Sequence, residues 1–182
     1  MGDREAAALA ARAAAGDDEA FGQLYEQYLD GVYRYVYYRV GATQDAEDVT
    51  QRVFCKAWEA MGRFQPNGTP FFAWVLRIAH NAVIDYWRTS KRTNPLEVEV
   101  TSQAAWADPV RAADLNCTQG ELRAAILGLK PEQQQVVLLR FIEGLDYPTV
   151  AAVMGKSEGA VRVLQCRALV VLRGRLSTEE RN

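Results

Sequence analysis

Apolar residues recur every three or four positions along most of the chain, and this spacing restricts the fold more than any other feature of the sequence. It is the repeat of one face of an α-helix, and the helix formers Ala, Leu, Arg, Glu and Gln are abundant. The alternation that a half-buried strand requires occurs only at Leu96–Val100, next to Pro95. The sequence therefore predicts an all-α protein.

One stretch interrupts the helical pattern and divides the chain. Residues 93–117 contain Pro95, Pro109 and several Ser, Thr, Asn and Asp residues, which is typical of a linker. The expected organisation is a tail or short helix (1–15), a helical domain (16–92), a flexible acidic linker (93–117), a smaller helical domain (118–176) and a tail (177–182).

The formal net charge of −2 conceals an alternation of charged blocks. Residues 1–50 carry a net charge of −6, residues 51–92 +5, residues 93–118 −3 and residues 119–182 +2. Two positive blocks are therefore separated by an acidic spacer, and a charge asymmetry of this kind bears on the partners of a protein rather than on its fold.

Several classes of function are disfavoured by composition. The cysteines, Cys55, Cys117 and Cys166, are far apart, which argues against a disulfide framework or a zinc ribbon and fits a reducing cytoplasm. His80 is the only histidine, so no metal site, cofactor or catalytic triad is expected. No run of about 18 apolar residues is present, so membrane insertion is not expected.

The helix expected over residues 71–88 has a polar face within the block of charge +5. On a helical wheel this face carries Trp74, Arg77, Asn81, Asp85 and Arg88. A solvent-facing indole can stack on a nucleic-acid base, and the neighbouring arginines can contact phosphates. The alternative is that the tryptophan packs beneath arginine stems or against another helix.

The second domain ends in a helix-turn-helix pattern. Pro131 begins a helix that Gly144 ends, and a short helix over Tyr147–Met154 precedes a turn in which Ser157 caps the last helix. The outward positions of that last helix are Arg162, Val163, Cys166, Arg167 and Arg173. Outward arginines on a second helix suit a reader of the DNA major groove, and the alternative is a plain helical hairpin.

Three segments in series resemble one known family. They are DAEDVTQRVFCKAW, FFAWVLRIAHNAVIDYWR and LKPEQQQVVLLRFIEGLDYPTVAAVMGKSEGAVRVLQCRALVVL. They are similar to regions 2.2, 2.3–2.4 and 4 of sigma-70-family factors of the extracytoplasmic-function (ECF) type, and the resemblance covers residues 17–176. It implies a bacterial transcription initiation factor that directs core RNA polymerase to promoters by reading the −35 and −10 elements and promotes DNA melting.

The resemblance also implies a role for particular residues. Core polymerase, through the clamp helices of its largest subunit, would be bound by Asp45, Glu47, Asp48 and Gln51. The −10 element would be bound by Asn67, Trp74, Arg77, Asn81, Asp85 and Arg88. The −35 element would be bound by Ser157, Arg162, Val163, Cys166 and Arg167. Further implied partners are the polymerase flap and an anti-sigma protein.

The sequence departs from the family pattern in the last helix. Val163 and Leu164 stand where the family usually has Ser-Arg, and residues 169–171 are apolar where further basic residues are common. The −35 sequence therefore cannot be inferred from the resemblance.

Two other classes of function are considered: a helix-turn-helix regulator that acts without polymerase docking, and an enzyme or helical adaptor. The second of these lacks a nucleophile–base pair.

Overall fold

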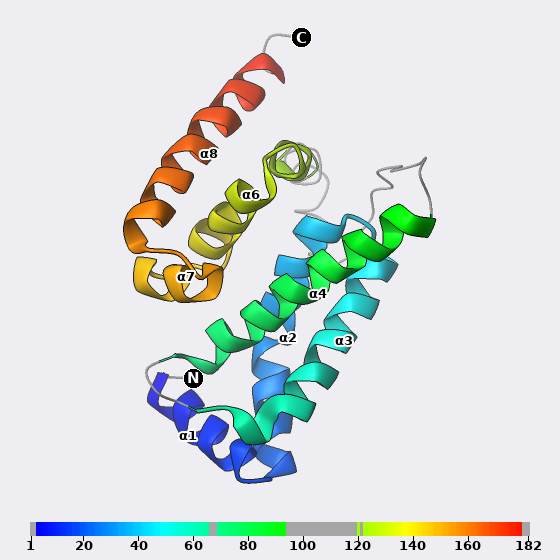
Figure 1. Ribbon diagram of the computed structural model, residues 1–182, viewed down its shortest axis with the longest axis vertical. Helices are drawn as coiled ribbons and strands as arrows, with labels where there is room; N and C mark the ends of the chain where they lie inside the picture. The colour runs from blue at the N-terminus through cyan, green and yellow to red at the C-terminus, as the bar shows by residue number, and fades with distance from the viewer. Residues whose placement is uncertain (1–2, 66–68, 94–119, 121, 180–182) are drawn as a thin grey trace, which may run out of the picture.

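The structure, a computed structural model, describes residues 3–65, 69–93, 120 and 122–179. All regular elements within these ranges are helices, which confirms the all-α prediction (Figure 1). They include α1 (Asp3–Ala14), α2 (Asp18–Val40), α3 (Thr43–Ala60), a 3₁₀ turn (Met61–Arg63), α4 (Phe71–Thr93), α6 (Pro131–Val137), the π-helix η2 (Leu138–Ile142), α7 (Tyr147–Met154) and α8 (Glu158–Glu179). Residues 122–127 are helical as well. None of the described helices is long and apolar enough to span a membrane.

The first domain is a bundle of α2, α3 and α4, with α1 across one end (Figure 1). Asp17 begins α2 by accepting a hydrogen bond from the Ala20 amide at 3.0 Å, and Gly41 ends it with a φ of 103°. Residues 1–15 were expected to form a tail or a short helix, and the structure has a helix there, α1. Its Leu9 and Ala10 side chains are buried in the core, and this packing stabilises the helix.

The second domain has the predicted helix-turn-helix. The Asp146 carboxylate caps α7 through the Thr149 amide at 2.9 Å, and Gly155, with a φ of 62°, makes the turn. Ser157 then caps α8, because its Oγ accepts a hydrogen bond from the Ala160 amide at 3.3 Å. The helix that begins at Pro131 widens into η2 before it ends, and α8 continues beyond the predicted boundary at residue 176.

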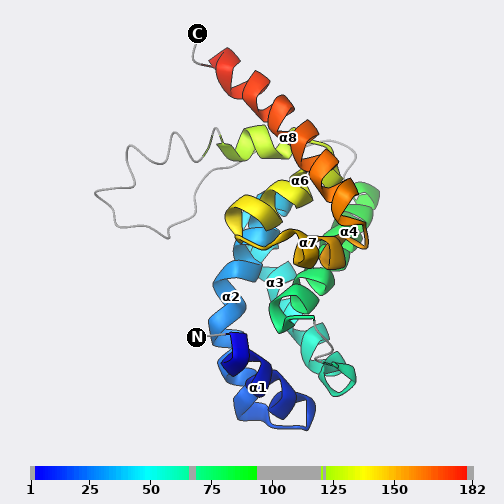
Figure 2. The ribbon, with the colours of Figure 1, turned by 90° about the vertical axis from the view of Figure 1, so that its left-hand side faces the viewer.

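The two domains pack against each other, with α7 on α4 and η2 on α2 (Figure 2). Arg34 of α2 donates two hydrogen bonds to the Glu143 carboxylate, at 3.0 and 3.2 Å. Gly31 permits this approach, because a Cβ there would lie 2.8 Å from Phe72 Cζ and 3.0 Å from Glu143 Oε2. The predicted linker residues 94–117 lie outside the described residues.

A polar cluster lies beneath this interface. The Arg39 side chain, 4% exposed, donates hydrogen bonds to the Tyr35 hydroxyl at 2.7 Å and to His80 Nδ1 at 3.0 Å. Burial, and then the nearby Arg39 charge, lower the pKa of His80 to about 4. His80 is therefore a neutral hydrogen-bond acceptor at neutral pH, with its proton on Nε2, and its role is structural.

Candidate nucleic-acid interface

The outer face of α4 has exposed Arg77, Asn81 and Arg88 side chains, as the helical wheel predicts. Trp74 differs from the expectation of a solvent-facing indole, because it is half-buried. Its ring centroid lies 4.9 Å from that of Phe64 and 5.6 Å from that of Phe71. The segment that follows α3 returns Phe64 to the start of α4, and a wheel of α4 alone could not anticipate this contact. One part of the indole is held by packing while the rest remains accessible.

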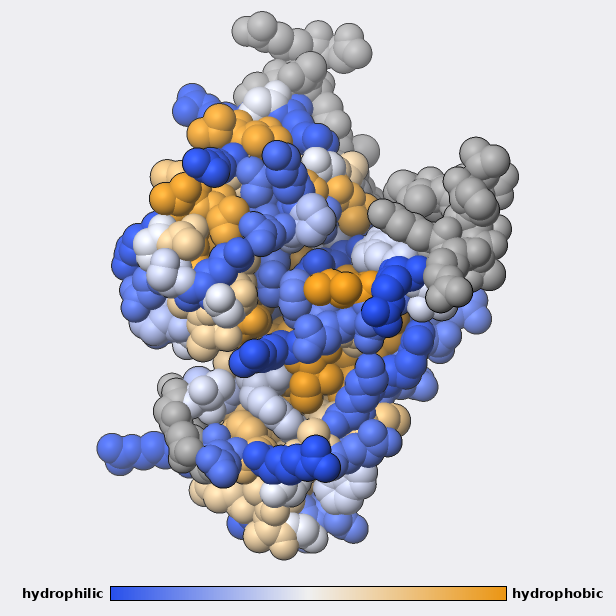
Figure 3. All heavy atoms as spheres, in the orientation of Figure 1, coloured by the Kyte–Doolittle hydropathy of each residue, from blue (hydrophilic) through white to orange (hydrophobic). Residues whose placement is uncertain are grey.

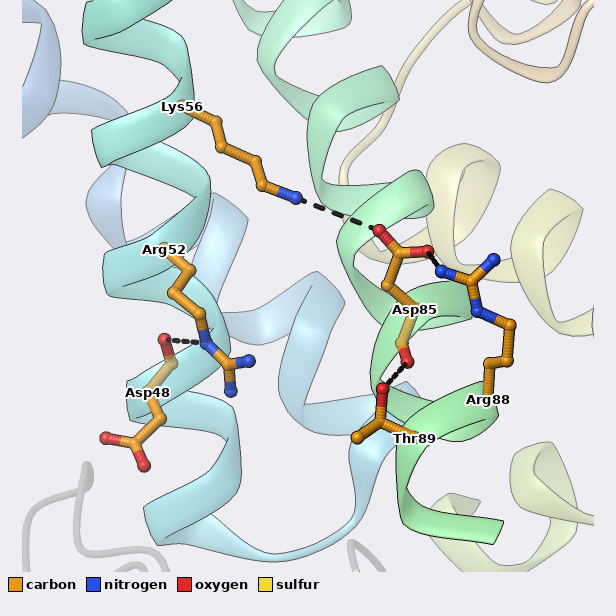
Figure 4. Close-up of polar contacts among 6 residues, drawn as sticks. All are labelled: Asp48, Arg52, Lys56, Asp85, Arg88 and Thr89. Atoms are coloured by element: carbon orange, nitrogen blue, oxygen red, sulfur yellow. Dashed lines mark hydrogen bonds and ion pairs between the residues drawn. The ribbon is translucent and has the colours of Figure 1, made fainter. Parts of the chain in front are cut away.

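Asp85 holds two cations on this face (Figure 4). One carboxylate oxygen lies 3.0 Å from Arg88 Nη2, and the other lies 3.8 Å from Lys56 Nζ on α3. The backbone carbonyl of Asp85 also accepts a hydrogen bond from Thr89 at 3.0 Å. Asp85 therefore holds Lys56 of α3 and Arg88 of α4 together as one basic surface. Lys56 was not among the residues predicted from the sequence.

A cavity of about 240 Å³ adjoins Trp74. Its walls include Arg63, Phe64 and Arg77 from the first domain, but also Ala152 and Val153 from α7. Asn67, proposed from the sequence as a base contact, lies outside the described residues. The helix-turn-helix domain thus partly covers the face predicted to bind the −10 element.

The exposed face of α3 carries Glu47, Asp48 and Gln51, as expected. Figure 4 shows the Asp48 carboxylate pointing away from Arg52, which donates instead to the Asp48 backbone carbonyl at 3.2 Å. Unlike these three side chains, Asp45 is engaged within the domain, because its carboxylate accepts a hydrogen bond from the Tyr86 hydroxyl at 2.7 Å. Burial, followed by this contact, raises the pKa of Tyr86 to about 12.

A groove of about 550 Å³ runs between α2 and α3 beside Glu47 and Gln51. Four tyrosines of α2 line it: Tyr25, Tyr33, Tyr37 and Tyr38. The half-buried rings place an aromatic surface next to the acidic and amide groups of α3.

The outward face of α8 presents Arg162, Val163, Cys166 and Arg167, all exposed as predicted, while Val161 and Ala168 are buried. Ser157 uses its side chain as the helix cap. Figure 3 shows apolar surface over α8, where Val170 is 74% exposed.

The described residues contain no cluster of three or more His, Cys, Asp or Glu side chains that could hold a metal ion.

Comparison with known proteins covers both domains. Residues 24–93 match sigma-70 region 2, and residues 119–172 match sigma-70 region 4. The chain is 42% identical to the ECF RNA polymerase sigma factor BldN of Streptomyces coelicolor over 168 residues, which are 90% of this chain and 63% of BldN. It is 32% identical to the ECF sigma factor SigD of Mycobacterium tuberculosis over 89% of this chain and 79% of SigD.

A solved structure resembles the whole two-domain arrangement. CnrH, in complex with the cytosolic domain of CnrY, superposes with a TM-score of 0.75 at 28% identity, over 96% of this chain and 98% of CnrH. The chain spans less than two thirds of the length of BldN. The matches to both sigma regions, and the identity to SigD over most of its length, show that the chain belongs to the sigma-70 family, as an ECF-type RNA polymerase sigma factor.

Proposed function

We propose that the chain is a transcription initiation factor that binds core RNA polymerase, directs it to promoters and promotes melting of the −10 element. The observation that carries the proposal is that one chain presents an aromatic and basic face on α4 and an arginine-bearing recognition helix, α8. The acidic and amide face of α3, with the tyrosine groove beside it, is the proposed polymerase contact. The chain itself carries out no chemical step and acts in the cytoplasm.

Melting of the −10 element is assigned to the start of α4. Extruding a base costs a few kcal/mol of stacking and pairing. Stacking on one aromatic ring returns about 1–3 kcal/mol. Trp74, supported by Phe64 and Phe71, is a pre-ordered platform for such a base, and Arg77 and Arg88 are the proposed phosphate contacts. Asp85 acts by holding Arg88, and Asn67 remains the proposed contact to a base edge.

The two domains must separate before both promoter elements are bound. Elements two helical turns apart are roughly 70 Å from one another, whereas here Arg34 and Glu143 are in direct contact. A chain of the length of residues 94–119 reaches roughly 85 Å when fully extended, so the covalent connection permits the separation. The arrangement in which α7 contacts α4 is therefore a closed state of the two domains. The initiation complex requires an open state, in which the two domains are apart.

A protein that holds the closed state is the second proposed kind of partner. CnrH, which has a similar two-domain arrangement, was solved with the cytosolic domain of another protein, CnrY. We infer that an anti-sigma protein binds this chain in its closed form and keeps α7 against α4.

Run-off transcription with core polymerase tests the proposal. The purified chain should bind core polymerase and direct transcription from promoters recovered by sequencing the transcripts it produces. A helix-turn-helix regulator without polymerase docking would bind DNA alone and give no promoter-specific transcript with core polymerase. Promoter-specific DNA binding without any association with core polymerase would contradict the proposal.

A further inference from the structure

Two arginines from different elements stack on one tyrosine in the second domain. The Arg162 guanidinium carbon lies 3.8 Å from the centre of the Tyr147 ring, and that of Arg140 lies 4.1 Å from it. Arg140 comes from η2, Tyr147 is the first residue of α7, and Arg162 lies on the outer face of α8. The cluster therefore joins both helices of the helix-turn-helix to the preceding element η2.

The geometry fixes the order of these groups. Two guanidinium groups so close to one ring centre cannot share a face of the ring, so they lie on opposite faces. The Arg140 side chain is restrained by a second contact, because it also donates a hydrogen bond to the Leu145 backbone carbonyl. The half-buried Tyr147 is thereby held between a fixed cation and the exposed Arg162.

Arg162 has little else to restrain it. Among the described residues it also forms an ion pair with Glu158 at 3.7 Å, and both side chains are about half exposed. Exposed ion pairs of this kind hold a side chain weakly. A guanidinium stacked on an aromatic ring keeps its in-plane N–H donors free for a phosphate or a base edge. Stacking also removes part of the ordering entropy that an unrestrained arginine loses on binding.

We infer that Tyr147 is a positioning residue for DNA recognition, which holds the Arg162 guanidinium in the orientation that contacts the −35 element. This inference rests on the proposed function of α8. Arg140, which belongs to η2, supports the ring from its other face.

A double-mutant cycle tests the inference in the holoenzyme formed with core polymerase. The variants are Tyr147→Leu, Tyr147→Phe, Arg162→Ala and Tyr147→Leu combined with Arg162→Ala, and the measurement is the affinity for a promoter that requires its −35 element. Tyr147→Leu should weaken binding about three- to tenfold. Tyr147→Phe keeps the ring and should retain the wild-type affinity, and the double variant should bind no more weakly than Arg162→Ala alone.

Each departure has a defined meaning. If Tyr147→Leu lowers affinity by the same factor with and without Arg162, or if Tyr147→Phe is as weak as Tyr147→Leu, Tyr147 does not act through Arg162 and the inference is wrong. If Arg162→Ala weakens binding but Tyr147→Leu does not, the inference is wrong while the proposed function stands. If Arg162→Ala has no effect, both the assigned role of Arg162 and the inference are wrong. Thermal unfolding of all variants checks that the domain remains folded.

Discussion

The closed state should open when Arg34 is replaced by alanine. Arg34 is 51% exposed at its side chain, whereas the Glu143 side chain that it contacts is only 2% exposed. In the closed state the substitution leaves a buried carboxylate without its cation. When the domains separate, water solvates that carboxylate, so the substitution penalises the closed state alone.

The size of the effect follows from these exposures. An unpaired buried polar group costs about 1–3 kcal/mol, and an ion pair with one exposed partner belongs to the lower part of that range. A change of about 1–2 kcal/mol raises the ratio of open to closed molecules about 5- to 30-fold. Glu143→Gln should not open the domains, because burial outweighs Arg34 and raises the pKa of Glu143, so a neutral group suits the closed state better.

Energy transfer between the two domains measures this equilibrium. Cys55 on α3 and Cys166 on α8 are both free and exposed, so each can carry a fluorophore once Cys117 is replaced by serine. Arg34→Ala should lower the transfer efficiency of the free chain. Arg12→Ala is the matched control, because Arg12 forms a 2.7 Å ion pair with Asp17 within the first domain.

Two results would refute the reasoning about Arg34. One is an Arg34→Ala chain that transfers energy as efficiently as the Arg12→Ala control. The other is a Glu143→Gln chain that opens as far as the Arg34→Ala chain. The first would mean that the ion pair does not hold the closed state and that apolar contacts such as those of α7 with α4 determine it. The second would mean that the charge of Glu143 stabilises the closed state, contrary to the argument that its burial disfavours the charged form.

Three further predictions concern the first domain. The free energy of unfolding should fall as pH decreases from about 6.5 to about 4, because the unfolded chain protonates His80 more readily than the folded one; His80→Gln should flatten this part of the profile in denaturant titrations. Trp74→Ala should slow strand opening on duplex promoters, as followed by permanganate footprinting, and recover on templates mismatched across the −10 element; normal opening on duplex would make Trp74 a packing residue only. Asp48→Lys should weaken binding to core polymerase without loss of stability. Asp45→Asn should lower the free energy of unfolding by about 1 kcal/mol, because it weakens the hydrogen bond that Tyr86 donates to Asp45. Equal thermal stability of the two variants would contradict this distinction.

The helices and their faces could be predicted because they depend on local rules. Gly41, Pro131 and Gly155 mark helix boundaries in the sequence, since backbone conformation at Gly and Pro is set within a few residues. The outward position of Arg162 on α8 follows from the helical period alone. The family resemblance added the order of the two domains and the roles proposed for their exposed faces.

Which neighbours each helix face meets depends on the tertiary structure. A helical wheel gives the direction of a side chain from its own axis, but not which neighbouring helix meets it. For this reason the contacts of Trp74 with Phe64, of Asp45 with Tyr86 and of Arg162 with Tyr147 were not predicted. The ion pair that closes the domains joins residues 109 positions apart, and no local pattern records such a contact. Local rules are therefore enough to predict the helices and most of their outward faces, whereas the packing of helices from distant parts of the chain sets which of those side chains are free to bind a partner.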